Sequence, residues 1–221
     1  MLFDVRAKHD GNGMGPYSVL CLGAHADDIE IGCGGTILRL IQMFGQGVEF
    51  HWVVFSAQAA RKREAAAGAD RFLSQAHKKT VMVKNFRDSL FPYSGRRIKA
   101  CFEQLKETCS PDLVLTHYRN DLHQDHRVIS ELTWNTFRNH LILEYEIPKY
   151  DGDLGTPNFF VPIDQPTCRK KIRTIVDCFA TQRDKPWFSE DTFLSLMRLR
   201  GIESNAPDKY AEAFYCRKLV V

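Results

Sequence analysis

Two short clusters of histidine and aspartate carry the residue types in this chain that could do chemistry. The first is Ala-His-Ala-Asp-Asp at residues 24–28, and the second is His-Gln-Asp-His at residues 123–126. Imidazole and carboxylate groups are ligands that divalent metals take, and two histidines with one aspartate leave positions open for water and substrate. The two clusters therefore predict a mononuclear metal site of the kind that hydrolases use.

Each cluster follows an apolar run that is typical of a buried strand. Residues 17–23 (Tyr-Ser-Val-Leu-Cys-Leu-Gly) precede the first cluster, and residues 113–115 (Leu-Val-Leu) precede the second. In open α/β sheets, ligands bind at the carboxyl ends of the strands. We therefore expect the fold to bring the two clusters together at one edge of a sheet.

The elements that must position these clusters follow from alternating apolar runs and helical stretches. The expected strands are 18–23, 48–56, 80–83, 112–116, 141–147, 159–163 and 214–220, and the expected helices are 34–44, 61–76, 95–108, one from near residue 123, 165–182 and 189–200. This order predicts an α/β fold, a Rossmann-like three-layer α/β/α sandwich with a mostly parallel sheet. The later elements and the turn-rich stretch 148–158 predict a C-terminal loop-rich and helical extension over the site.

The same motifs resemble those of a known family, the PIG-L/LmbE-like N-deacetylases. Its pattern A-H-P-D-D-x-E-x-G-x-x-G-T-I is matched at residues 24–37, D-x-H-x-D-H is matched at 121–126, and Tyr-Ala-Glu-Ala-Phe at 210–214 resembles a later segment. The resemblance implies one domain over residues 1–221, with a Rossmann-like core at about 15–140 and a substrate-side part at about 141–221. It also implies a zinc-dependent hydrolase that removes acetyl from an N-acetylated amino sugar or sugar conjugate.

The resemblance implies that His25, Asp28 and His126 are the metal ligands, and the chemistry of these groups agrees. Two neutral imidazoles and one carboxylate leave a bound Zn²⁺ with a net positive charge, which lowers the pKa of its water toward ~7. Fe²⁺ or Co²⁺ would suit the same ligands. Asp27 lies beside a ligand and is expected to act as the general base. The alternative is a structural role as the N-cap of the following helix.

Two residues of the second cluster are expected to assist the reaction. The carboxylate of Asp125 would accept a ring N–H of His123 and so orient it. A protonated His123 would then stabilise the oxyanion and protonate the leaving amine. Asp121 and Glu30 are expected to be supporting or capping groups.

Substrate contacts and departures from the family pattern follow from the same comparison. Arg63 and Asp88 fall where the family keeps an Arg and an Asp that bind sugar hydroxyls. Ala26 replaces the usual Pro, and residues 179–182 read Phe-Ala-Thr-Gln where relatives have a His, which favours a substrate unlike the best-known thiol-precursor sugars. The loop at 150–158, with its glycines and acidic side chains, is expected to help shape the pocket.

Composition argues against nucleic-acid-binding, membrane-spanning and secreted proteins. The net charge of +3 on 221 residues is too small and dispersed for nucleic-acid binding. No apolar window is long enough to span a membrane, and residues 1–6 are too polar for a signal peptide, so we expect a cytoplasmic protein. The expected partner is an N-acetyl amino sugar, nucleotide sugar or glycoconjugate, and a homo-oligomer is allowed.

Two other functions stay open on the sequence alone. A non-haem Fe(II) oxygenase also uses two histidines and a carboxylate, although such sites usually lie on β-rich scaffolds. A non-catalytic sugar-binding module could keep the fold, but it would not need Asp27 or His123. Dinucleotide binding is disfavoured, because residues 32–37 have Ile where the Gly-rich fingerprint requires its last Gly.

Overall fold

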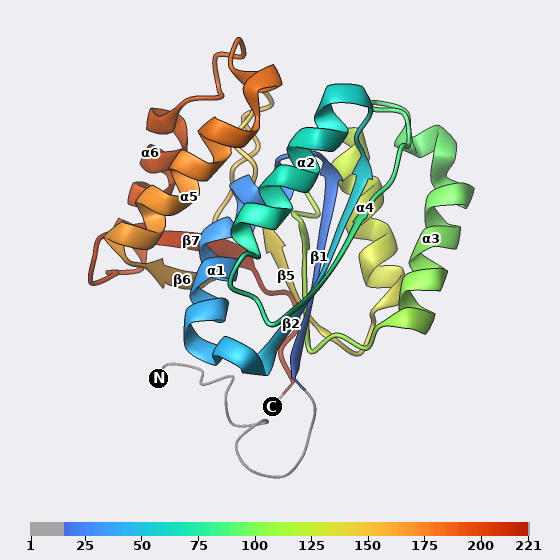
Figure 1. Ribbon diagram of the computed structural model, residues 1–221, viewed down its shortest axis with the longest axis horizontal. Coiled ribbons are helices and arrows are strands. Elements are labelled where there is room, and N and C mark those ends of the chain that lie inside the picture. Colours follow the sequence, from blue (N-terminus) through green and yellow to red (C-terminus); the bar gives the residue numbers. More distant parts are fainter. Residues whose placement is uncertain (1–15, 221) are drawn as a thin grey trace.

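The computed structural model describes residues 16–220 (Figure 1), so the start of the chain, residues 1–6 included, lies outside the described part. One seven-stranded sheet has the strand order β3-β2-β1-β4-β5-β7-β6. The strands are β1 (Tyr17–His25), β2 (Val48–Ser56), β3 (Lys78–Val83), β4 (Leu113–His117), β5 (Leu141–Tyr145), β6 (Phe159–Ile163) and β7 (Tyr210–Tyr215). The helices are α1 (Asp28–Phe44), α2 (Ala59–Phe72), α3 (Gly95–Thr108), α4 (Gln124–Thr136), α5 (Gln165–Cys178) and α6 (Glu190–Glu203), with short 3-10 turns η2 (Gly45–Gly47), η3 (Phe91–Ser94) and η4 (Ala180–Gln182).

The sheet is mostly parallel, and its topological switch point, where the order of successive strands reverses direction, lies between β1 and β4. Strands β1 to β5 pair in parallel, whereas β7 runs antiparallel to both β5 and β6. The chain leaves β1 toward β2 on one side and returns to β4 on the other. The crevice at the carboxyl ends of β1 and β4 is where such folds bind ligands, and both polar clusters follow these two strands.

Helices cover both faces of the sheet, as the alternating pattern predicts (Figure 1). Val19 and Cys21 of β1 face the core that is shared with α1, α2 and α5, whereas Leu20 and Leu22 face the core that is shared with α3 and α4. Alternate side chains of a strand point to opposite faces, so a strand buried on both faces reads as one apolar run. The three-layer sandwich is confirmed.

Several element boundaries differ from the sequence-based expectation, and those of α1 and the last strand differ most. Helix α1 begins at Asp28 rather than at Gly34, because the glycines of this run serve close packing inside the helix. A Cβ on Gly32 would lie 2.2 Å from a ring carbon of Tyr145 on β5. The last strand covers 210–215, not 214–220, since residues 210–214 pair there with β6, the strand at the edge of the sheet.

A buried ion pair between α5 and β7 forms hydrogen bonds with backbone groups in the middle of α1. Glu212 accepts hydrogen bonds from the backbone N–H groups of Gly35 (2.7 Å) and Thr36 (2.6 Å), and Lys171 donates to the Ile31 carbonyl (2.6 Å). In a regular helix the Gly35 N–H would bond to that same carbonyl. The two groups that form this helical hydrogen bond thus each contact one member of the Lys171–Glu212 pair (2.6 Å), which ties α1 to the C-terminal elements.

Those C-terminal elements extend the sandwich toward the carboxyl edge of the sheet. Helix α5 packs against α1 and α2, and α6 packs against β7 and α5. Within residues 16–220, no helix has both the length and the apolar character that crossing a bilayer requires.

Candidate active site

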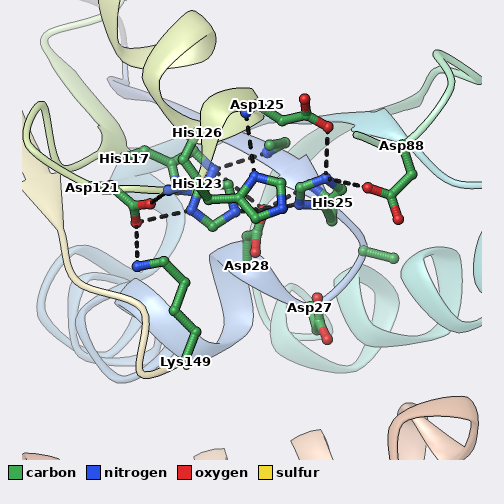
Figure 2. Close-up of polar contacts among 12 residues, drawn as sticks. His25, Asp27, Asp28, Asp88, His117, Asp121, His123, Asp125, His126 and Lys149 are labelled. Carbon is green, nitrogen blue, oxygen red and sulfur yellow. Dashed lines mark hydrogen bonds and ion pairs between the residues drawn. The ribbon is translucent and has the colours of Figure 1, made fainter. Parts of the chain in front are cut away.

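The three expected metal ligands converge at the switch point (Figure 2). His25 is the last residue of β1, Asp28 is the first of α1, and His126 lies in the first turn of α4. His25 Nδ1 lies 3.2 Å from His126 Nε2, and Asp28 Oδ2 lies 3.4 Å from His25 Nδ1 and 3.6 Å from His126 Nε2. One strand end and two helix starts thus place three donor atoms at the corners of a small triangle.

This triangle has the dimensions of a tetrahedral metal site. Ligand atoms that lie 2.0–2.1 Å from a tetrahedral zinc are separated from one another by about 3.4 Å. The three separations in this protein lie on either side of that value, and the three donors are two nitrogens and one oxygen. The residues present therefore fit a divalent metal.

The charge states of His126 and Asp28 suit a metal. For His25, burial lowers the pKa, but hydrogen bonds to Asp125, Asp28 and Asp88 raise it well above its usual range, so a metal would have to displace a proton from this ring. Burial and the neighbouring His117 ring lower the pKa of His126 to about 4, so that this imidazole is neutral at neutral pH. Burial would raise the pKa of Asp28, but the His126 and His117 rings hold it well below its usual range. A neutral imidazole and an ionised carboxylate are the forms that bind metal.

Carboxylates hold the outer nitrogens of both histidine ligands. His25 Nε2 lies 3.1 Å from Asp125 Oδ2 and 3.1 Å from Asp88 Oδ1, and His126 Nδ1 lies 2.9 Å from Asp121 Oδ2. Asp121 in turn forms an ion pair with Lys149 (3.0 Å). Such carboxylate–histidine pairs orient metal ligands and increase their basicity. The supporting role expected for Asp121 agrees with this geometry.

His117 is a site residue that the sequence reasoning missed. It ends β4, its Nε2 lies 3.2 Å from Asp28 Oδ2 and accepts the Ala24 N–H (2.9 Å), and its ring stacks on that of His126. It could form a second metal-binding group with Asp121 and His126, and His25, His123 and Asp125 form a third. Of the three groups, only that of His25, Asp28 and His126 lines the cavity with all its members.

Asp27 lies beside this triangle, and one of its two carboxylate oxygens makes no hydrogen bond among the described residues. Its backbone is left-handed (φ 98°), and its Oδ1 accepts from Arg61 Nη2 at 3.1 Å. Its Oδ2 is buried and has no hydrogen-bond partner among residues 16–220. Burial raises the pKa of Asp27 to about 7 despite the opposing charge of Arg61, and the Asp28 carboxylate raises it further. The carboxylate is therefore a stronger base than an ordinary aspartate.

The structure corrects the expected partnership of His123 and Asp125. Asp125 directs its carboxylate to His25 and to the backbone N–H groups of Ser89 (2.7 Å) and Phe91 (3.1 Å), and it makes no hydrogen bond to the His123 ring. His123 is instead the N-cap of α4, and its Nδ1 accepts the backbone N–H of Asp125 (3.2 Å).

The His123 ring is poised as a neutral donor. Because Nδ1 accepts a hydrogen bond, Nε2 must carry the proton of the neutral ring. Burial and the nearby His25 lower the pKa of His123, which disfavours the protonated ring expected from the sequence. His123 lines the cavity together with His25 and His126.

The two substrate-binding candidates have different positions. Asp88 lines the cavity and pairs with His25, which lowers its pKa through their hydrogen bond. Arg63 is exposed on α2 and does not line the cavity, whereas Arg61 does. Arg61 contacts Asp27 and the Ala26 carbonyl, so it is the arginine of this helix that reaches the site.

A cavity of about 720 Å³ opens onto the triangle. The C-terminal extension forms one wall with Thr181, Gln182, Lys185 and Trp187, which confirms that this part of the chain covers the site. From the loop at 150–158, only Tyr150 and Asp151 line the cavity. Asp153 instead binds Lys149 (2.5 Å) and the Leu122 N–H (2.7 Å).

The segment that lacks the family's histidine still reaches the site. Phe179 is buried, with the Arg61 guanidinium 5.9 Å from its ring centroid. Thr181 donates its hydroxyl to Glu64 (2.6 Å), which also faces Arg61 at 3.6 Å. This segment therefore supports Arg61.

Glu30 is fully buried, and neither of its carboxylate oxygens has a hydrogen-bond partner among the described residues. Burial holds its pKa well above the usual range.

Comparison with known proteins identifies the family. The family model described as PIG-L, GlcNAc-PI de-N-acetylase, matches residues 20–137, which is more than half of the chain and includes both polar clusters. The chain belongs to the PIG-L family. The match ends just after α4, so the part of this PIG-L protein that forms the C-terminal wall of the cavity lies beyond the family model.

Several solved structures share the fold of this PIG-L protein. The N,N'-diacetylchitobiose deacetylase of Pyrococcus horikoshii, complexed with its inhibitor MPG, is 24% identical with a TM-score of 0.67, over 90% of this chain and 82% of that one. The zinc-inhibited form of teicoplanin deacetylase Orf2 is 14% identical with a TM-score of 0.67, over 90% and 97%. The 4-carboxy-2-hydroxymuconate hydratase GalB of Pseudomonas putida is 18% identical with a TM-score of 0.71, over 94% and 98%. Because a hydratase shares the fold, the reaction must be argued from the site.

Proposed function

We propose that this PIG-L protein is a metal-dependent hydrolase that removes the acetyl group from an N-acetylated amino sugar or sugar conjugate. The observation that carries the proposal is the geometry at the switch point. A triangle of ligand atoms from His25, Asp28 and His126 and the carboxylate group of Asp27 lie at the same cavity. Membership in the PIG-L family and the likeness to deacetylases support the choice of an acetamide as the bond that is broken.

The three ligands would hold one divalent ion, with Zn²⁺ preferred by two nitrogens and one oxygen and with Fe²⁺ or Co²⁺ as alternatives. When bound, such an ion polarises a carbonyl and acidifies water. Asp125 and Asp121 keep the His25 and His126 rings turned toward the ligand triangle. The carboxylate pairs thus define which ring nitrogens are free to bind.

Asp27 is the group that would move the proton. Its carboxylate would accept a proton from water as the water oxygen bonds to the acetamide carbon, and the hydrogen bond from Arg61 to Oδ1 holds the group in place. The same carboxyl then gives the proton to the nitrogen as the carbon–nitrogen bond breaks. Acetate and the free amine are the products, and Asp27 returns to its starting state.

His123 would stabilise the negative charge that develops on the carbonyl oxygen. Its Nδ1 is committed to the Asp125 N–H, so the Nε2 proton is available for donation. A donor fixed in advance on a helix cap needs little reorganisation during the reaction. Neutral His123 can serve as this donor, which differs from the protonated ring expected from the sequence.

The test is release of acetate from N-acetylhexosamines and their conjugates by metal-loaded protein. Stoichiometric acetate and free amine would support the proposal. An Fe(II) oxygenase would instead consume 2-oxoglutarate, and the mostly parallel α/β sheet disfavours that alternative. A sugar-binding module would bind the same sugars without turnover, and either of these outcomes would contradict the proposed hydrolysis.

A further inference from the structure

Lys149 is a nearly buried cation that the reaction proposed above does not use. It lies in the connection between β5 and β6, and its side chain is 9% exposed. Its Nζ lies 3.0 Å from Asp121 Oδ2 and 2.5 Å from Asp153 Oδ2, and both carboxylates are buried. Charges that are buried together depend on one another for neutralisation. Lys149 therefore joins two segments of the chain, and it lies beyond residues 20–137, which the family model matches.

The first of these segments contains Asp121, the carboxylate that holds the metal ligand His126 (Figure 2). Asp121 Oδ2 lies 2.9 Å from His126 Nδ1 and 3.0 Å from Lys149 Nζ, so a single oxygen atom joins the imidazole to the ammonium group. Asp121 Oδ1 accepts the backbone N–H of His123 (2.8 Å). Both oxygens of this carboxylate are thus held, and Lys149 holds it from outside the segment 121–126.

The second carboxylate adds another contact to the same segment. Asp153 Oδ2, which pairs with Lys149, also accepts the backbone N–H of Leu122 (2.7 Å), the residue directly after Asp121. The connection between β5 and β6 therefore contacts the chain before α4 at two successive residues.

The connection that carries Lys149 is fixed independently of the site. Arg200 of α6 donates to both carboxylate oxygens of Glu146 (2.9 and 2.7 Å) and to the carbonyl of Gly155 (3.1 Å). The Gly155 N–H donates to the hydroxyl of Tyr215 on β7 (2.9 Å). The backbone is thus held on either side of Lys149 in the sequence. The two residues that follow Lys149 line the cavity, so this connection is part of the cavity wall.

We propose that Lys149 is a positioning residue that joins this wall to the metal ligand His126 through Asp121. The proposal rests on the metal-dependent function proposed above, because it concerns how firmly the ion is held. A carboxylate that is fixed at both oxygens holds the imidazole in one orientation, and such orientation raises the affinity of the ring for metal. If Lys149 only neutralised two buried carboxylates, its loss would lower the stability of the fold and leave the metal affinity unchanged.

The test uses the double variant Lys149→Met/Asp153→Asn, which removes one charge of each sign and so preserves the net charge beside the ligand triangle. The control Lys79→Met/Asp70→Asn makes the same two substitutions in an ion pair on the surface (2.6 Å). The affinity for Zn²⁺ is measured by chelator competition, under conditions in which urea unfolding shows each protein to be folded. We expect the Lys149 variant to bind Zn²⁺ about tenfold more weakly, at the lower end of the effect of losing a group that orients a ligand. The control should keep the wild-type affinity.

A double-mutant cycle tests the route through Asp121. Asp121→Asn alone should weaken Zn²⁺ binding, and adding Lys149→Met/Asp153→Asn to it should cause little further loss, because residues that act through one contact are not additive. Equal losses with and without Asp121→Asn would overturn the proposal, and so would wild-type or tighter binding by the Lys149 variant. Should the methionine variant not fold, Lys149→Gln/Asp153→Asn takes its place with the same expectation, since glutamine is also uncharged and is one atom shorter than lysine.

The metal affinity is measured without turnover, so this proposal can fail or succeed apart from the deacetylase function. Weaker Zn²⁺ binding by the Lys149 variant, together with a wild-type protein that releases no acetate, would keep the positioning role and refute deacetylation. Acetate release by the wild type, together with equal Zn²⁺ affinities for the wild type and the Lys149 variant, would keep deacetylation and refute the positioning role.

Discussion

Replacing Asp27 by asparagine isolates the proposed base from every other contact at the site. Asparagine keeps an oxygen in place of Oδ1, so the hydrogen bond from Arg61 (3.1 Å) can persist. It also tolerates the positive φ of 98° at this position, where alanine would add ~1–2 kcal/mol of backbone strain. The amide that replaces Oδ2 cannot accept the proton of water.

The expected effect is therefore on the chemical step alone. Loss of a general base typically reduces the rate by ~10²–10⁴-fold, and we expect Asp27→Asn to lower kcat within that range. Metal content should stay at the wild-type level, because Asp27 is not one of the three ligands. Stability should not fall, because the change removes a buried carboxylate oxygen that lacks a partner.

The assay measures acetate release, metal content and urea unfolding on the same preparations. Asp70→Asn is the matched control, since Asp70 is exposed and pairs with Lys79 on the surface (2.6 Å). An Asp27→Asn variant with kcat within a few-fold of wild type would refute the base assignment. Loss of activity in proportion to loss of metal would also refute it, because Asp27 would then act through the ligand triangle.

Three other changes test neighbouring parts of the site and the fold. His123→Ala should lower kcat more than it raises KM, because its donor acts on charge that develops in the transition state; a change in KM alone would make it a substrate-binding residue. Asp121→Asn should weaken metal affinity ~10–100-fold by loosening His126, as measured by chelator competition, and unchanged affinity would contradict its orienting role. Glu212→Gln should lower the free energy of unfolding by ~3–5 kcal/mol, because it leaves Lys171 buried without its charged partner. The control Lys79→Met removes a surface ion pair and should lower it by at most ~1 kcal/mol. Equal effects of the two changes in urea unfolding would contradict this prediction.

The sheet and the ligand triangle were predictable because they depend on short-range patterns. The fully buried β1 reads as one apolar run, and its end places His25 three residues before Asp28 in a tight turn. The switch point then determines that the strand paired with β1 on its other side is β4, which precedes the second cluster. Spacing and topology together therefore predict where His126 must be.

Other features depend on contacts that spacing does not encode. Arg61 and Arg63 lie two positions apart, and about 100° per residue turns them to different sides of α2, so a motif match could not show which one reaches Asp27. The Asp125 carboxylate is directed by Ser89 and Phe91, which belong to another loop. His117 is the last residue of β4, two positions after the apolar run 113–115, and an imidazole at the carboxyl end of such a strand is the signal that could have found it.

The central claim is that one divalent ion held by His25, Asp28 and His126 is required for amide hydrolysis. The most direct measurement is a titration of chelated protein with Zn²⁺, Fe²⁺ or Co²⁺ that follows bound metal and acetate release together. We predict that the chelated protein releases no acetate, that activity returns in proportion to metal up to one ion per chain, and that a folded His126→Ala variant neither retains the ion nor regains activity. Wild-type acetate release by the metal-free protein, or stoichiometric metal retained by His126→Ala, would contradict the account.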